Sequence, residues 1–149
     1  EFIVIGAQDN TTVTMTVSDN TKGGRQPGET FSVVLNAGES YQVQAAAGSD
    51  DLTGSRITSD KPCSVFSGNV WTGVPAGCSY RDNLLEQMYP VATWGRQFVT
   101  VPFAFGNYDL FRVMAAQDTS RRICRVQSLG GHLGERRQTN CGYSIQYRL

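Results

Sequence analysis

The sequence lacks an excess of charge of either sign, because 13 basic residues balance 13 acidic ones among 149 residues. Nucleic acids and anionic membrane surfaces attract proteins that carry a basic face, so this balance argues against both as the main partner. Long apolar runs are also missing, since none approaches the roughly 20 residues of a membrane-spanning helix. We therefore predict a partner other than nucleic acid and no membrane span in this segment.

The sequence also lacks the residue arrangements that are typical of catalytic and metal-binding sites. His132 is the single histidine, and it has no partner at the spacing of a metal site. The sequence contains no GxSxG turn, no phosphate-cradling loop and no Cys–His nucleophile arrangement. Asp82 and Glu86 are the nearest approach to a carboxylate pair, but local pairing with Arg81 is the simpler interpretation. We predict that the chain is not an enzyme and holds no metal ion or cofactor.

Four cysteines, Cys63, Cys78, Cys124 and Cys141, permit three disulfide pairings and include no Cys-x-x-Cys motif. Disulfides in an oxidising compartment are the favoured interpretation, and four reduced cysteines in a cytosolic fold are the alternative. Asn10-Thr11-Thr12 is an N-glycosylation sequon in a predicted turn. Charged residues make up only 17% of the chain. Together these features favour an extracellular all-β protein.

Alternating side chains predict most of the strands. Along residues 11–17, Val13, Met15 and Val17 share one face and threonines occupy the other, as in a half-buried strand. The apolar run at residues 2–5 comes just before, and we expect the two runs to form a hairpin. Further strands are predicted at residues 30–35 and 40–46, and two short ones around a turn within residues 54–67.

A second β unit is predicted to begin near residue 91, with strands at residues 97–103, 110–116, 123–126 and 143–147. Residues 2–9 match residues 111–118 at five of eight positions, which indicates a duplicated β unit. We predict antiparallel β-sandwich-like units in tandem. One nearly complete unit spans residues 1–68, a connecting loop with a short helical turn spans 69–90, and an incomplete unit spans 91–149. A β-propeller is the alternative architecture.

The glycine- and proline-broken loop over residues 69–81 is the predicted binding surface, and its candidate residues are Asn69, Trp71, Tyr80 and Arg81. Aromatic side chains at such a place bind sugars or protein loops. The alternative is that they fill the seam between two β units. Residues 120–149 hold six arginines against one acidic residue, which indicates either a glycan-binding patch or a solvated face.

Several short segments, taken in order, resemble the N-terminal region of the IgGFc-binding proteins, a family of mucin-associated extracellular proteins. The resemblance covers about residues 1–118. It is carried by EFxV from residue 1, DLTGSxI from residue 51, KPxxVFSG from residue 61, EQxxP from residue 86 and WGxxFV from residue 94.

The sequence departs from the family pattern at one place. Family members have a cysteine shortly after the Ser-Gly, and a second cysteine and a histidine before the Glu-Gln. Trp71, Arg81 and Asn83 stand at these positions here. Both cysteines of the disulfide that the family pattern implies are therefore absent together. Cys78 is then an alternative partner for Cys63.

The resemblance implies a secreted or cell-surface protein without enzymatic activity. We predict a binding or adhesion module whose partner is an extracellular protein or glycoprotein, either mucin-like or an immunoglobulin. Two hypotheses compete with this one. A structural spacer within a large adhesin would bind no ligand by itself, and a glycan hydrolase would place Glu86 in a cleft with a second carboxylate.

Overall fold

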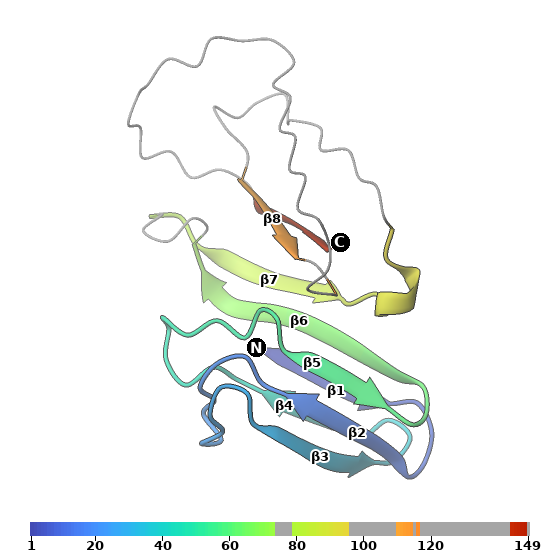
Figure 1. Cartoon of the computed structure of the whole chain (residues 1–149). Helices are drawn as coiled ribbons and strands as arrows, with labels where there is room; N and C mark the ends of the chain where they lie inside the picture. The colour runs from blue at the N-terminus through green and yellow to red at the C-terminus, as the bar shows by residue number, and fades with distance from the viewer. Residues whose placement is uncertain (74–78, 96–109, 115, 117–143, 149) are drawn as a thin grey trace. The chain divides into compact units, whose positions relative to one another are not determined.

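The computed structural model describes residues 1–73, 79–95, 110–114, 116 and 144–148. The chain divides into two compact units, one formed by Glu1–Thr72 and Asp82–Pro90 and the other by Gly73–Arg81 and Val91–Leu149. Regular structure in the described segments consists of β-strands and one short 3-10 turn, η1 (Val91–Thr93) (Figure 1). The all-β prediction is therefore confirmed. The strands predicted at residues 97–103 and 123–126 lie outside the described residues.

The first unit consists of two antiparallel sheets. In the four-stranded sheet, β4 (Ser40–Val43) is followed by β1 (Phe2–Gly6), β6 (Cys63–Thr72) and β7 (Asp82–Gln87). In the three-stranded sheet, β2 (Thr11–Thr16) lies between β3 (Thr30–Leu35) and β5 (Arg56–Ser59). Among the described strands, this topology leaves β4 and β7 as the edges of one sheet, and β3 and β5 as the edges of the other (Figure 1).

The hydrophobic core lies between the facing sides of these two sheets. Every second residue of β1 and β2 is buried, which is the two-residue period of strands with one covered face. Val4, Val13 and Met15 are fully buried. The remaining core side chains come from both sheets and from the loops: Phe2, Val17, Leu35, Val43 and Leu52. Each such side chain contributes roughly 1.5–3 kcal/mol through its removal from water.

The predicted hairpin of residues 2–5 with residues 11–17 is wrong. β1 pairs with β4 and β6, whereas β2 pairs with β3 and β5, so the two strands belong to different sheets. The turn between them passes from one layer to the other, with Asn10 in the left-handed region at φ 54°, which asparagine tolerates. This crossing brings the apolar faces of β1 and β2 against each other, whereas a hairpin would align them within one sheet.

The short helical turn predicted within residues 69–90, which the paired apolar residues of 83–88 suggested, is also wrong, because Asp82–Gln87 forms strand β7. β7 pairs with β6, which continues five residues beyond the strand end expected at Ser67. Gly68 is therefore not a strand breaker. It lies opposite Leu85 in the ladder, and a Cβ at this position would collide with the carbonyl oxygen of Leu84. The close approach of the two backbones requires glycine.

The second unit contains β8 (Leu110–Met114) and β9 (Ser144–Arg148), which pair in parallel. This differs from the antiparallel pairing expected for a second unit. It also differs from β1, the counterpart of β8 in the proposed repeat, since both neighbours of β1 are antiparallel. Parallel neighbours need a long connection, and the segment between β8 and β9 supplies one. Within the described part of the chain, no helix has the length and apolarity to cross a bilayer.

Candidate functional site

A β-bulge near the end of β6 turns two apolar side chains toward solvent. The pairing of β6 with β7 keeps one register from Phe66 to Asn69 and shifts by one residue before Thr72. Val70 and Trp71 together therefore oppose the single residue Asn83, which is the defining feature of a bulge. Their exposed fractions are 64% and 63%. The Trp71 amide donates to the Asn69 side-chain oxygen at 3.0 Å, and this bond fixes the local turn.

Beside the bulge, β7 forms the outer strand of its sheet, and all six of its residues are exposed. Leu84 and Leu85 are among them, with exposed fractions of 44% and 69%. A strand at the end of a sheet presents one side of its backbone to another chain. We call the surface formed by Asn69, Val70 and Trp71 of β6 together with β7 the β6–β7 edge. It combines apolar side chains with a strand edge.

The four predicted binding residues divide between the two units. Asn69 and Trp71 lie together at the bulge of the first unit. Tyr80 and Arg81 belong to the second unit, where both are exposed, Tyr80 by 82%. The assignment of these four residues to binding stays a prediction. Val70, Leu84 and Leu85 were not among the sequence candidates, because neither the bulge nor the β7 strand was expected.

Asp82 and Glu86, the carboxylates of the hydrolase hypothesis, both lie exposed on the strand β7. Residues four apart still share one face of a strand, but their backbones are about 13 Å apart. The helical turn expected from the sequence would have brought the two side chains closer together. The exposed position of Glu86 also differs from the cleft that the hydrolase hypothesis predicts.

Two candidate modification sites can be placed. Asn10 is exposed at the turn between β1 and β2, so its glycosylation stays a prediction at an accessible position. Cys63 is half-buried with a free thiol, and its sulfur lies 3.3 Å from the Ser59 hydroxyl oxygen. Cys78, Cys124 and Cys141 lie outside the described residues, so the disulfides also stay a prediction.

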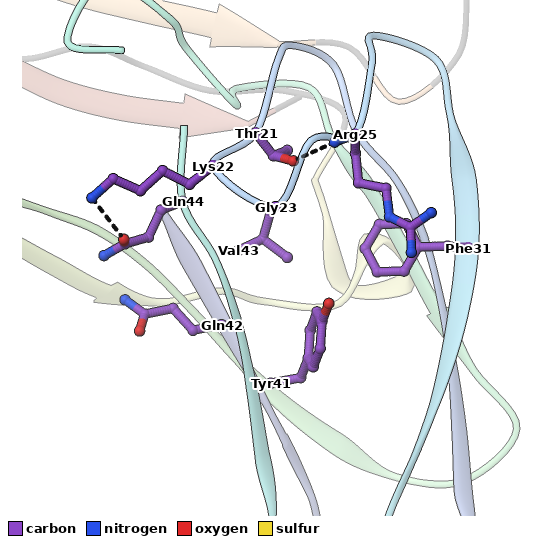
Figure 2. Close-up of a pocket in the computed structure, with 9 residues that line it drawn as sticks. All are labelled: Thr21, Lys22, Gly23, Arg25, Phe31, Tyr41, Gln42, Val43 and Gln44. Carbon is purple, nitrogen blue, oxygen red and sulfur yellow. Dashed lines mark hydrogen bonds between the residues drawn. The ribbon is translucent and has the colours of Figure 1, made fainter. Parts of the chain in front are cut away.

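A pocket of about 190 Å³ opens where β3 and β4, the edge strands of opposite sheets, face each other (Figure 2). Phe31 of β3 and Tyr41 of β4 bring their rings to a centroid distance of 6.0 Å. The loop that follows β2 contributes Lys22 and Arg25. The Arg25 guanidinium carbon lies 4.5 Å from the centroid of the Phe31 ring, in cation–π geometry. The pocket therefore combines aromatic and cationic groups.

The loop over residues 19–29 is fixed by two carboxylates with lowered pKa values. The side-chain bond from Arg25, and then the backbone N–H of Gln26, lower the pKa of Glu29 below its ordinary value of 4.5. The backbone N–H groups of Asp51 and Asn20 lower the pKa of Asp19. In both cases the ionised form is favoured in the folded state.

Replacing Glu29 by glutamine is expected to lower stability at neutral pH and to remove part of the acid sensitivity. Because the pKa is depressed in the folded state, the contribution of Glu29 is fully present above about pH 4.5 and is lost as the pH falls through the folded pKa. Thermal unfolding from pH 7 to pH 3 should therefore show the gap between wild type and Glu29→Gln closing in acid. A gap of constant size would contradict this, and Glu86→Gln, an exposed carboxylate on β7, serves as the control.

Comparison with known proteins identifies the family. The family model described as IgGFc binding protein matches residues 1–125. The chain belongs to the IgGFc-binding protein family. The human IgGFc-binding protein is 30% identical over 123 residues, which is 80% of this chain and 2% of that protein. The resemblance found from the sequence motifs is thereby confirmed. No solved structure matches the chain.

The chain spans about 2% of the length of its human relative. The β6–β7 edge and the pocket between β3 and β4 are two surfaces of the described residues that a ligand could reach. The β6–β7 edge includes Asn69 and Trp71 of the loop predicted from the sequence. The pocket was not predicted, because its residues come from three separate segments without a shared motif.

Proposed function

We propose that this domain is a non-catalytic extracellular module that captures an immunoglobulin-type glycoprotein through the β6–β7 edge. The observation that carries the proposal is the bulge, which exposes Val70 and Trp71 beside a fully exposed edge strand. A buried position would be the ordinary place for a tryptophan that only stabilises the sheet. Tryptophan is also among the residues that contribute most to protein–protein binding.

The chemistry of the β6–β7 edge fits a partner built from β-sheets. An outer strand binds a second strand through main-chain hydrogen bonds, and neighbouring side chains supply specificity. Immunoglobulin domains are β-sandwiches. The family and its human relative are named for binding the Fc part of IgG, so the Fc fragment is the first partner to test. The extracellular setting agrees with the accessible sequon at Asn10.

Substituting Trp71 by alanine is expected to weaken capture of the human IgG Fc fragment by roughly 30-fold or more, because a central interface tryptophan is worth about 2 kcal/mol or above. Surface plasmon resonance with the full 149-residue chain measures this. Val70→Ser should also weaken binding. Val34→Ser is its matched control, since Val34 is similarly exposed, at 61%, on the other sheet. Equal binding by wild type and Trp71→Ala would refute the proposal.

The same measurement separates the competing functions. A structural spacer would bind neither the Fc fragment nor purified mucin. Binding to mucin but not to Fc would replace the proposed partner while retaining the binding role. If Val34→Ser abolishes binding and Val70→Ser does not, the interface lies on the β3 side of the sandwich and not at the β6–β7 edge.

A further inference from the structure

We propose that the pocket between β3 and β4 binds a single acidic sugar residue, a pyranose ring that carries a carboxylate or sulfate group. This goes beyond the capture of a protein at the β6–β7 edge, because β3 and β4 are edge strands that make no part of that surface. The proposal rests on the size of the pocket, its aromatic rings, the sign of its charge and the fixed position of its polar groups.

The volume of the pocket matches one small unit of a ligand. Pockets that enclose drug-sized molecules measure roughly 300–1,000 Å³, and this one has about 190 Å³. Its apolar part is the pair formed by Phe31 and Tyr41, whose ring planes are tilted by 58°. Tyr41 remains 36% exposed although it shares a face with the buried Val43. The Tyr41 ring offers a flat apolar surface against which the C–H face of a sugar can pack, whereas the Phe31 ring carries the Arg25 guanidinium on one face.

The charge around the pocket favours an acidic ligand. Lys22 and Arg25 both line it, and no acidic side chain is among its lining residues (Figure 2). Two carboxylates bond to lining residues without lining the pocket themselves. Glu29 pairs with Arg25 at 2.5 Å, and Glu1 accepts hydrogen bonds from two lining glutamines. Arg25 is therefore held by Glu29, whereas Lys22, which donates to Gln44, is the lining cation without a carboxylate partner in the described part of the chain.

The polar groups are fixed before any ligand arrives. Glu1 accepts from the side-chain amides of Gln42 and Gln44 at 2.8 and 2.7 Å, so one N–H of each amide is committed. The oxygen of Gln44 accepts from the Lys22 ammonium at 3.4 Å. The Gln42 oxygen then remains as an acceptor for a sugar hydroxyl, and Lys22 retains further N–H groups for an anion.

The loop that carries the two cations is tied to the segment that follows β4. Thr21 is buried, with an exposed fraction of 5%. Its hydroxyl oxygen accepts a hydrogen bond from the Arg25 backbone amide at 3.0 Å. The Lys22 amide donates to the Gln44 carbonyl at 2.9 Å, and the Ala46 amide donates to the Asn20 carbonyl at 3.0 Å. A loop ordered in this way loses little further entropy when a ligand binds.

Titration of the 149-residue chain, followed by its backbone amide NMR signals, tests the proposal. The probes are methyl glucuronide, galactose 6-sulfate, neutral methyl galactoside and inorganic sulfate. We expect at least one acidic sugar to saturate with millimolar affinity and to shift the amides of residues 21–25 and 41–44. The affinity should fall with added salt, because the cations are near the surface. Which acidic sugar binds more tightly distinguishes carboxylate from sulfate as the recognised group.

Variants connect the signal to the pocket. Lys22→Gln should weaken binding of the acidic sugar about tenfold, as expected for a lost hydrogen bond between charged groups, and Tyr41→Ala should also weaken it. Arg56→Gln, which removes an exposed cation on β5, should leave binding unchanged. Methyl galactoside or inorganic sulfate binding as tightly as the acidic sugars would overturn the proposal. So would shifts confined to other residues, or unchanged affinity of Lys22→Gln.

Discussion

Replacing Met15 by alanine is expected to lower the free energy of unfolding of the first unit by about 2–5 kcal/mol, the range for large-to-small substitutions in packed cores. Met15 is fully buried near the end of β2, the middle strand of its sheet. It pairs with Phe31 on one side and Ile57 on the other. The cavity left by alanine therefore opens between the two sheets, where neighbouring side chains are held by both strand ladders.

Urea unfolding followed by the amide signals of β1 and β2 measures this loss for the first unit alone. Val34→Ala is the control, because Val34 lies on the adjacent strand β3 but is 61% exposed. Its replacement should change stability by no more than about 0.5 kcal/mol. A loss below about 1 kcal/mol for Met15→Ala would show that the core does not lie between these sheets.

Replacing Gly68 by alanine is expected to separate β7 from β6 and to abolish Fc capture. In an ordinary strand this change would stabilise the protein by roughly 0.5–1 kcal/mol. Here the added Cβ would meet the backbone of Leu84 and Leu85, which cannot move without breaking the ladder. The steric cost, about 1–3 kcal/mol for overpacking, therefore exceeds the gain. The effect should be local, because the fully buried core side chains lie outside β6 and β7.

Hydrogen exchange of residues 82–87 reports this separation directly, and we expect these amides to lose protection in Gly68→Ala while those of β1 and β2 keep it. Gly48→Ala is the matched control, since a Cβ at Gly48 would meet nothing within 4 Å. Unchanged protection of β7 together with unchanged Fc binding would show that the close approach at Gly68 is not needed.

Alternation of side chains was sufficient to predict the strands with one buried face. The segment over residues 30–35 agrees with β3 at both ends, and the alternation of Val13 and Met15 gave β2 to within one residue. β7 could not be found in this way, because all six of its residues are exposed and Leu84 and Leu85 lie side by side. Its structure depends on pairing with β6 and not on burial.

The candidate site could be predicted only in part, because it too depends on pairing between segments that are distant in the sequence. Asn69 and Trp71 were found because a broken, aromatic-containing segment follows a strand, but the bulge that exposes Trp71 arises from a register shift between two strands. The pocket brings together Lys22, Phe31 and Tyr41 from three segments. No local pattern links them, since their proximity follows from β3 and β4 being edges of opposite sheets.

Hydrogen exchange of the chain with and without the human IgG Fc fragment tests most directly whether the β6–β7 edge is the binding surface. The proposed mode predicts new protection of the β7 amides, because the outer strand would bond to the partner, together with protection around Val70 and Trp71. Amides of β3 and β5, at the edges of the other sheet, should exchange as before. Protection confined to those strands, or no protection at saturating Fc, would contradict it.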